Sequence, residues 1–326
     1  MSNGLVTIVM PYYDVPVKLV ERAILSVIAQ TSSEWRMIIV DDSSKKSLQK
    51  LETIAKEERI EYVMLSENGG VSAARNEGLR RVKTPFVMFL DADDALDAKA
   101  VQKLLDVQKN SEAEIVGFNF KMTANRKLTS AERRFQSVQL TNRLVSGSDA
   151  LRMLLSGKLR HLVYLYMYKT ELFINISFPI GRAYGEDYSI VYKLLNSAKA
   201  VEIIPDRLYE YFQNQESVMH NPKESHAKDI LDASNEIISF FRSTKVLTPE
   251  EEFLYWMYIT PRLLNAYAIS YRNKNNQLIE EIGSLLSQVD VNKMTRMKKR
   301  DVLKLVVFKL KIFNILLNVE GRLHGR

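Results

Sequence analysis

Residues 86–94 read FVMFLDADD, a short run of large apolar side chains that leads directly into three carboxylates. Runs of the same kind recur through the first 120 residues, and most of them are nearly continuous in β-branched or bulky apolar residues. Such runs are typical of strands that are covered on both faces of a parallel sheet. The predicted strands are Leu5–Met10, Met37–Val40, Ile60–Leu65, Phe86–Leu90 and Glu114–Phe118.

Amphipathic stretches separate these runs. Val101, Leu104, Leu105 and Gln108, for example, recur at the three-to-four spacing that places residues on one face of a helix. The predicted helices are Val17–Gln30, Leu48–Glu58, Val71–Val82 and Ala98–Lys109. This alternation of strands and helices predicts an α/β fold with a doubly wound, mostly parallel sheet.

The pattern loosens over residues 121–222, and from about residue 223 periodic helical stretches dominate. They are Lys228–Phe241, Glu250–Tyr271, Asn276–Val289 and Asp301–Val319. We therefore expect a domain over residues 1–222, divided at about residue 120, and a helical region over 223–326.

The composition of the 326 residues is that of a globular protein, with a formal net charge of +7. That charge is local, because residues 291–326 contain ten Lys and Arg against two acids and the rest of the chain is nearly neutral. A uniformly basic nucleic-acid-binding protein is therefore not expected. The absence of cysteine excludes disulfides and thiolate chemistry. We expect neither a signal peptide nor a membrane span, since no apolar run reaches about 18–20 residues.

In an open parallel sheet, ligands bind outside the carboxyl ends of the strands, so the residues after each strand locate the site. Polar clusters follow the first four predicted strands. They are Pro11-Tyr12-Tyr13-Asp14, Asp41-Asp42-Ser43-Ser44, Glu67-Asn68-Gly69-Gly70 and Asp91-Ala92-Asp93-Asp94. Each cluster alone is also ordinary turn and helix-cap chemistry. Four of them on one edge predict a binding site.

The acids at 91, 93 and 94 repel one another unless a cation or a basic group lies between them. Carboxylates suit a hard divalent ion such as Mg²⁺ or Mn²⁺, which keeps open positions for substrate phosphates. The chain has no GxGxxG after its first predicted strand and no GxxxxGK[ST] anywhere, which argues against dinucleotide and P-loop sites. We therefore expect a nucleotide bound through a metal-bridged diphosphate.

The order and spacing of five segments together resemble the family-2 glycosyltransferases of GT-A fold. The segments are Pro11-Tyr12-Tyr13-Asp14, ERAILSVIAQT (21–31), IIVDDSS (38–44), ENGGVSAARNEGL (67–79) and FLDADD (89–94). The resemblance covers residues 5–120 strongly and 160–222 more loosely. It implies a catalytic domain with a nucleotide-sugar half (1–120) and an acceptor half (121–222), and a UDP-sugar donor from which a hexosyl or N-acetylhexosaminyl group is transferred.

The resemblance also implies which side chains hold the nucleoside. Pro11, Tyr13 and Asp14 would line its pocket, with the ring of Tyr13 against the uracil. Asp41 and Asp42 would accept hydrogen bonds from the uracil imide or the ribose. Many family members carry Asn or a different acid after the aromatic residue, so Asp14 departs slightly from the pattern.

At the phosphate end, the resemblance gives Asn68 and Arg75 to the base and phosphate environment. Asp91, Ala92 and Asp93 form its DxD motif, with Asp93 as the direct metal ligand and Asp91 directed toward the metal, the ribose or the sugar. A later segment that reads YEYFQNQESVMH (209–220) resembles a loop that closes over the diphosphate, where His220 would contact phosphate or metal. A solvated loop histidine is the alternative for His220.

The acceptor side is expected at Gly185-Glu186-Asp187-Tyr188, which resembles the family's ED motif. Transfer with inversion needs one base that takes the proton of the acceptor hydroxyl, while the metal neutralises charge on the departing UDP. Asp187 is the expected base, and Glu186 would contact the acceptor or support Asp187. Alternatively, the two acids only favour the dipole at the start of a helix.

The segment KLVVFKLKIFNILLNV (304–319) has the pattern of a basic amphipathic helix at a membrane surface. Lys304 and Lys311 fall on one face, and Phe308 and Ile312 fall on the other. Packing of that apolar stripe on its own domain or on a second copy is the alternative, and nucleic acid is not an expected partner.

Taken together, these features predict an inverting, metal-dependent enzyme that transfers sugar from a UDP-sugar to a hydroxyl of a surface glycan, glycolipid or teichoic-acid-like polymer. We expect it in the cytoplasm, peripheral at the inner face of the membrane and open to homo-oligomerisation. Two alternatives are a nucleotidyltransferase that uses an acidic metal site and a non-catalytic scaffold with a degenerate transferase domain.

Overall fold

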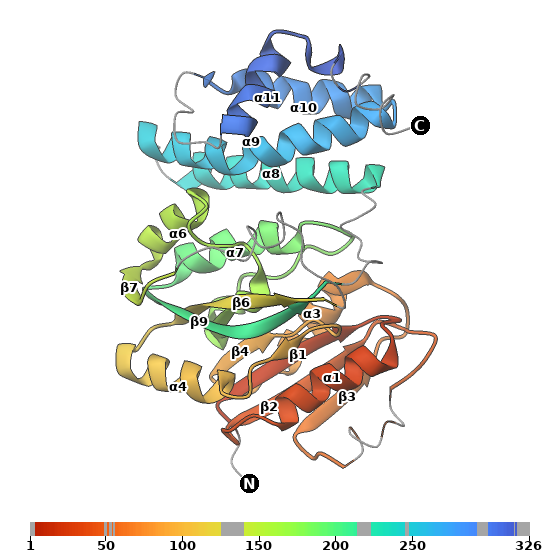
Figure 1. Ribbon diagram of the computed structural model, residues 1–326, viewed down its shortest axis with the longest axis vertical. Coiled ribbons are helices and arrows are strands. Elements are labelled where there is room, and N and C mark those ends of the chain that lie inside the picture. The colour runs from red at the N-terminus through yellow and green to blue at the C-terminus, as the bar shows by residue number, and fades with distance from the viewer. Residues whose placement is uncertain are drawn as a thin grey trace. The chain divides into compact units, whose positions relative to one another are not determined.

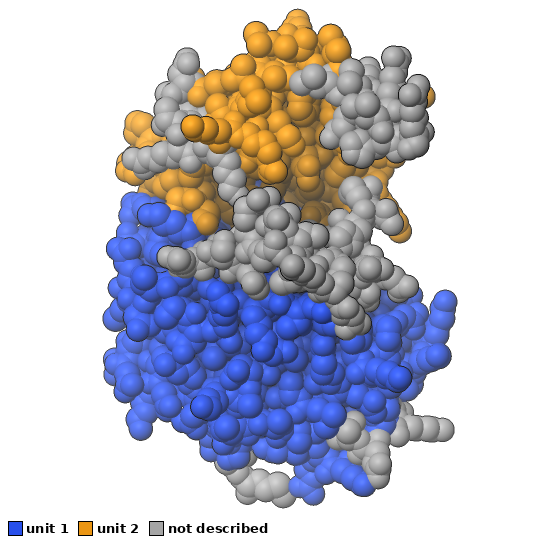
Figure 2. Space-filling view, in the orientation of Figure 1, with its two compact units in different colours: residues 1–154, 158–182, 186–217 blue, residues 155–157, 183–185, 218–326 orange. Residues whose placement is uncertain are grey.

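The computed structural model describes residues 4–48, 51, 54, 56–124, 140–213, 223–244, 248–291, 299–315 and 317. The chain divides into two compact units (Figure 2). Unit 1 comprises residues 1–154, 158–182 and 186–217, and unit 2 comprises residues 155–157, 183–185 and 218–326. Parts of the predicted helix Leu48–Glu58 and of the predicted loop over 121–141 lie outside the described residues, as does His220.

Unit 1 is built on a nine-stranded mixed sheet within the described part of the chain (Figure 1). Its strands are β1 (Val6–Tyr12), β2 (Trp35–Asp41), β3 (Ile60–Met64), β4 (Phe86–Phe89), β5 (Ala95–Leu96), β6 (Ile115–Thr123), β7 (Arg143–Ser146), β8 (Tyr166–Lys169) and β9 (Ala200–Phe212). The strand order is β3-β2-β1-β4-β8-β6-β9-β5, and β7 pairs with β9.

The first four strands form the parallel part of the sheet, as the apolar runs predict. In the register, Tyr12 of β1 lies beside Asp41 of β2, and Asp41 lies beside Met64 of β3. β4 is parallel to β1, with Phe89 beside Val9. The carboxyl ends of these strands therefore meet at one edge, and the four polar clusters follow them there.

The rest of the sheet is more mixed than predicted. β8 runs antiparallel to β4, so the residues before Tyr166 lie beside the carboxyl end of β4, just before Asp91. The two-residue strand β5 pairs antiparallel with β9 and brings Tyr209 beside Leu96. Both pairings carry residues from the second half of unit 1 to the edge where the polar clusters lie.

Helices of unit 1 connect and cover these strands (Figure 1). They are α1 (Val17–Ile28), α3 (Gly70–Arg81), α4 (Ala100–Ser111), α6 (Gly147–Leu155) and α7 (Glu186–Ser197). α3 packs on β1 and β2, and Gly78 permits its close approach, because a Cβ there would lie 2.3 Å from a methyl group of Val9. Short 3₁₀ turns, Val163–Leu165 and Thr170–Phe173, flank β8.

Unit 2 contains the helical C-terminal region, which confirms the helical pattern of the sequence. Its helices are α8 (Glu224–Thr244), α9 (Pro249–Arg272), α10 (Asn276–Gln288) and α11 (Lys299–Lys309). α9 begins at a capping box in which Thr248 accepts from the Glu251 N–H and Glu251 accepts from the Thr248 N–H. α8 and α10 pack against α9, and the rings of Phe241 and Tyr255 stack 5.7 Å apart.

The last helix is shorter than the predicted stretch Asp301–Val319. α11 ends at Lys309, and Lys311 adopts a left-handed backbone with φ of +60°, which interrupts the helix. Leu305 is buried, and the centroid of the Phe308 ring lies 5.1 Å from that of the Tyr267 ring. Leu305 and Phe308 therefore pack within unit 2. Within the residues that the structure describes, no helix has the length and apolar character needed to cross a bilayer.

Candidate active site

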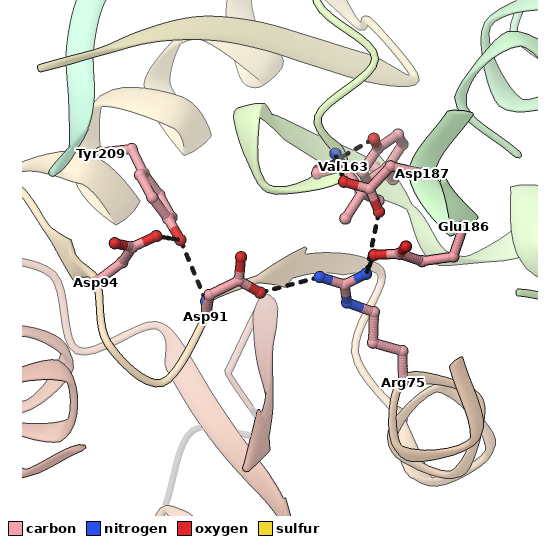
Figure 3. Close-up of polar contacts among 8 residues, drawn as sticks. Arg75, Asp91, Asp94, Val163, Glu186, Asp187 and Tyr209 are labelled. Carbon is pink, nitrogen blue, oxygen red and sulfur yellow. Dashed lines mark hydrogen bonds and ion pairs between the residues drawn. The ribbon is translucent and has the colours of Figure 1, made fainter. Parts of the chain in front are cut away.

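A buried arginine lies at the centre of the candidate site (Figure 3). Arg75, on α3, is 2% exposed. Its Nη1 lies 2.8 Å from Oε1 of Glu186 and 3.0 Å from Oδ1 of Asp187, and its Nη2 lies 2.9 Å from Oδ1 of Asp91. One guanidinium therefore joins the carboxylate that follows β4 to the two carboxylates that begin α7.

The cluster places one guanidinium among three carboxyl groups. Burial alone lowers the pKa of Arg75, but the carboxylates of Asp187, Asp91 and Glu186 raise it overall, so the guanidinium stays protonated. Its Nε is buried and has no hydrogen-bond partner among the described residues. Arg75 was predicted to serve the base and phosphate environment of a nucleotide. In the structure its two Nη atoms contact carboxylates.

Asp187 lies in the first turn of α7, where burial dominates its electrostatics. The residue is 8% exposed, and its Oδ2 accepts a 2.9 Å hydrogen bond from the N–H of Val163. Burial raises the pKa of Asp187 to about 8, against the lowering effects of Arg75 and of the Val163 N–H; Glu186 adds to the rise. A carboxylate whose pKa lies near the working pH is suited to accept a proton from a hydroxyl.

The turn after β4 is held by groups that the sequence did not indicate. The N–H of Asp91 donates to the hydroxyl oxygen of Tyr209 at 3.1 Å, and that hydroxyl donates to Oδ2 of Asp94 at 2.6 Å. Oδ1 of Asp94 accepts from the N–H of Phe212 at 2.7 Å. Both carboxylate oxygens of Asp94 are thus used to fix the turn against β9.

Asp93 carries negative charge that the fold compensates only in part. Burial raises the pKa of Asp93 to about 6, with a further contribution from Asp91, and the charge of Arg22 opposes the rise. The Arg22 guanidinium donates to the backbone oxygen of Asp93 at 2.5 Å and lies over the Phe212 ring at 4.4 Å. A cation beside the two carboxylates would remove the remaining repulsion.

Within the described residues, no three His, Cys, Asp or Glu side chains are arranged to hold a metal ion by themselves. Two carboxylates, Asp91 and Asp93, fit a hard divalent ion that takes its other ligands from phosphate oxygens and water. Ala92 between them is 4% exposed and turned into the core. The predicted third contact, His220, lies outside the described residues.

At the end of β2, two buried aspartates accept hydrogen bonds from neighbouring backbone and side-chain groups. Oδ1 and Oδ2 of Asp42 accept from the N–H groups of Gly69 and Gly70, each at 2.8 Å, at the start of α3. Oδ1 of Asp41 accepts from the Ser44 N–H at 2.7 Å, and its Oδ2 accepts from the Tyr62 hydroxyl. A contact between either aspartate and a bound base has to use the remaining lone pairs.

The residues after β1 are more open. Tyr13 is 49% exposed. Asp14, with φ of +49°, accepts from the Lys45 N–H at 2.9 Å and donates its own N–H to the Ser44 hydroxyl at 3.1 Å. Pro11, the penultimate residue of β1, is half-buried. The Asn68 side chain donates to the Asp42 carbonyl at 3.1 Å.

Sequence reasoning missed Arg22, Val163, Tyr209 and Phe212. Val163, Asp91 and Phe212 contribute backbone N–H groups, which have the same chemistry in every residue type except proline. Arg22 and Tyr209 lie in two segments that carry the resemblance, 21–31 and 209–220, but the sequence assigned no role to either side chain. Val163, Tyr209 and Phe212 reach the site through the placement of β8, which runs antiparallel to β4, and of β9, which pairs with β5 and β6.

Comparison with known proteins identifies the family. The model of the glycosyl transferase family 2 matches residues 7–173, just over half of the chain. The uncharacterized glycosyltransferase EpsJ of Bacillus subtilis is 29% identical over 225 residues, which cover 67% of this chain and 64% of EpsJ. The poly(ribitol-phosphate) beta-N-acetylglucosaminyltransferase TarP of Staphylococcus aureus is 34% identical over 115 residues, which cover 34% of this chain and 35% of TarP. The chain thus spans less than two thirds of the length of either relative.

A solved structure shows the same fold over a longer range. TarS 1-349 of S. aureus, in complex with UDP-GlcNAc, matches with a TM-score of 0.71 and covers 100% of this chain and 93% of the TarS chain, at 17% sequence identity. At that identity the likeness concerns the fold. Together with the family match, it confirms the fold that the five sequence segments implied: the chain is a glycosyltransferase of family 2, with the GT-A fold.

Proposed function

We propose that this enzyme transfers a sugar, with inversion, from a UDP-sugar to a hydroxyl of a cell-surface glycan, glycolipid or teichoic-acid-like polymer. The observation that carries the proposal is the contact of Arg75 with Asp91 on one side and with Glu186 and Asp187 on the other. It brings the acids expected at the donor and the acid expected as the base into a single site. The UDP-GlcNAc complex of TarS and the polymer-modifying activity in the name of TarP support the donor and acceptor classes.

In this proposal Asp187 is the base. Its Oδ1 is oriented by Arg75 and its Oδ2 by the Val163 N–H, so the carboxylate is held in one direction. As the acceptor oxygen attacks the anomeric carbon, Asp187 takes the hydroxyl proton, and the bond from that carbon to the UDP oxygen breaks on the opposite face. Glu186, whose Oε1 is paired with Arg75, contacts or orients the acceptor.

The nucleotide is proposed to lie along the ends of β1–β4. The exposed ring of Tyr13 lies against the uracil, and Pro11, Asp14, Asp41, Asp42 and Asn68 surround the nucleoside. Asp91 and Asp93, with Ala92 between them, would hold a Mg²⁺ or Mn²⁺ ion, and His220 would add a contact to phosphate or metal. When bound, that ion supplies positive charge that stabilises the departing diphosphate.

The described part of unit 2 presents a cationic and apolar surface, which we propose holds the enzyme at the anionic inner face of the membrane. Leu303 and Leu310 of α11 are 63% and 64% exposed, and Ile315 beyond it is 58% exposed. Lys299 and Lys311 are exposed in the same segment. Exposed apolar side chains beside cations are the combination that binds an anionic lipid surface.

The proposed reaction is tested by incubating the purified protein with UDP-glucose, UDP-galactose, UDP-GlcNAc and UDP-GalNAc and measuring UDP release with Mn²⁺, Mg²⁺ or EDTA. We expect metal-stimulated release of UDP from at least one donor, increased by a polymer or lipid-linked acceptor. Release of pyrophosphate from a nucleoside triphosphate would favour the nucleotidyltransferase instead. Folded protein that releases UDP from none of the donors would refute the proposal. The non-catalytic scaffold would then be the remaining alternative.

A further inference from the structure

The segment that immediately precedes the Glu186–Asp187 pair is anchored to helix α8. The backbone N–H groups of Ala183 and Tyr184 both donate to Oδ2 of Asp229, each at 3.1 Å. Asp229 lies on the second turn of α8 and is 8% exposed. Two successive backbone N–H groups that converge on one carboxylate oxygen form a fixed, anion-binding turn.

A ring contact reinforces this anchor. The ring of Tyr184 stacks on the ring of His226, one turn before Asp229 on α8, with centroids 5.1 Å apart and an angle of 22° between the planes. His226 is itself fixed, because it is buried and its Nδ1 accepts from the Lys223 N–H at the start of α8. Burial lowers the pKa of His226, so the imidazole is neutral and its stacking does not depend on a charge.

The anchored turn leads into α7 through a glycine in the left-handed backbone conformation. Gly185 has φ of +78°, a conformation that L side chains adopt only with strain. Glu186 follows directly as the first residue of α7, and Asp187 is next. Only Gly185 and Glu186 therefore separate the anchored amide of Tyr184 from the proposed base.

We infer that Asp229 is a positioning residue for sugar transfer, which sets the place of Glu186 and Asp187 through the anchored turn Ala183–Gly185. The inference rests on the proposed function of Asp187. Asp229 does not touch the reacting atoms; it fixes the start of the chain segment that carries the base. A misplacement of about 1 Å in a reacting group costs on the order of 100-fold in rate. Loss of this anchor therefore reduces turnover more than donor binding.

The chemistry of the anchor gives a conservative rescue. Both N–H groups use the same oxygen of Asp229, so the amide oxygen of Asn at this position accepts both bonds, whereas Ala accepts neither. We expect Asp229→Ala to lower the kcat of transfer about 10- to 100-fold, with the KM for the UDP-sugar within about twofold. Asp229→Asn should keep kcat within about threefold of the wild type. Asp232→Ala removes a carboxylate from the same helix without touching either bond, and serves as the matched control.

Amide hydrogen exchange tests the anchor without relying on turnover. Exchange in the peptide that covers residues 183–189 should be faster in Asp229→Ala than in the wild type, and close to wild type in Asp229→Asn and Asp232→Ala. If Asp229→Ala does not fold, Tyr184→Ala, which removes the half-buried ring but keeps the backbone, should show the same increase in exchange and a smaller fall in kcat.

Wild-type kcat in folded Asp229→Ala, an equal loss of kcat in Asp229→Asn and Asp229→Ala, or unchanged exchange over residues 183–189 would each overturn the inference. Failure of the proposed function has a different signature. In that case the wild type itself does not transfer sugar, while the exchange difference between Asp229→Ala and Asp229→Asn is still observed.

Discussion

Nη1 of Arg75 lies 3.0 Å from Oδ1 of Asp187, although the two residues are 112 positions apart in the sequence. The same guanidinium contacts Asp91, which follows β4. A charge buried in this way is stable only because its partners are also buried and aligned with it. Asp91 and the Glu186–Asp187 pair are thus held together by a cation that the folded chain itself supplies.

Replacement of Arg75 by methionine should destabilise the fold. The variant keeps the length of the side chain but leaves three carboxylates without their cation, and we expect a loss of about 3–5 kcal/mol in the free energy of unfolding at neutral pH. Arg75 lowers the pKa of Asp187, so without Arg75 that pKa rises further. The folded variant therefore regains stability as pH falls and this carboxyl is protonated. Urea unfolding of wild type and Arg75→Met at about pH 5 and pH 8 should therefore show a larger difference at pH 8.

Arg80→Met is the matched control for that experiment. Arg80 lies on the same helix with its side chain 67% exposed and paired with Glu77 at the surface. Exposed ion pairs contribute at most about 1 kcal/mol, so its loss should be small at both pH values. Equal effects of the two substitutions would contradict the central role of Arg75.

Replacement of Asp187 by asparagine should separate binding from chemistry. The side chain keeps its size and can still accept the Val163 N–H, but it cannot take up a proton as a carboxylate does. We expect kcat for transfer to fall by about 10²–10⁴, the usual contribution of a general base. The affinity for the UDP-sugar, measured by calorimetry, should change only a few-fold. Unchanged transfer by the folded variant would refute the assignment of the base.

The rate should depend on pH through Asp187. Burial raises its pKa to about 8 in the folded protein, and only the ionised form accepts a proton. The value of kcat/KM, which reports ionisations of the free enzyme, should rise with pH and level off above about pH 8. Stability runs the other way, since a carboxyl with a raised folded-state pKa contributes most below its unfolded value of about 4 and loses that contribution as pH rises to about 8. A flat rate profile between about pH 6 and pH 9 would contradict this ionisation.

How much of the fold was predictable depends on the range of the contacts involved. β1–β4 and helices α1, α3 and α4 are encoded by local apolar runs and helical spacing, and the sequence predicts them to within a few residues. β5 has two residues and β8 has four, and neither is long enough for its own sequence pattern to predict a strand. Their place follows from pairing with β9, β4 and β6, which no local pattern records.

The candidate site shows the same division. The acids at the ends of β2 and β4 were predicted to share one edge because the register of a parallel sheet requires it. The partner of Asp187 was not predictable, because Arg75 lies in a segment that resembles a donor motif and the structure turns its guanidinium toward α7 as well. The break at Lys311 was also missed, since the apolar spacing continues through it while the backbone does not.

Replacement of Tyr209 by phenylalanine should test the turn that carries Asp91. The hydroxyl accepts from the Asp91 N–H and donates to Asp94, whereas the ring stacks on Tyr164 at 4.4 Å and would be retained. Two buried polar groups lose a partner, so we expect a loss of about 1–3 kcal/mol in the free energy of unfolding. A double-mutant cycle with Asp94→Asn should give a coupling energy of at least about 0.5 kcal/mol. Strict additivity of the two changes would show that this hydrogen bond does not hold the turn.

The surface around α11 should determine binding to anionic vesicles. We expect the protein to sediment with vesicles that contain phosphatidylglycerol but not with pure phosphatidylcholine. Each basic side chain near an anionic surface contributes about 1 kcal/mol, so Lys299→Glu with Lys311→Glu should weaken binding by more than tenfold. Leu310→Ser with Ile315→Ser removes exposed apolar area without changing charge and should weaken binding at both low and high salt. UDP release without acceptor should be unaffected by all four substitutions, because none lies in unit 1. Binding to both kinds of vesicle alike, or wild-type binding by the charge-reversed variant, would show that this surface does not recognise the membrane.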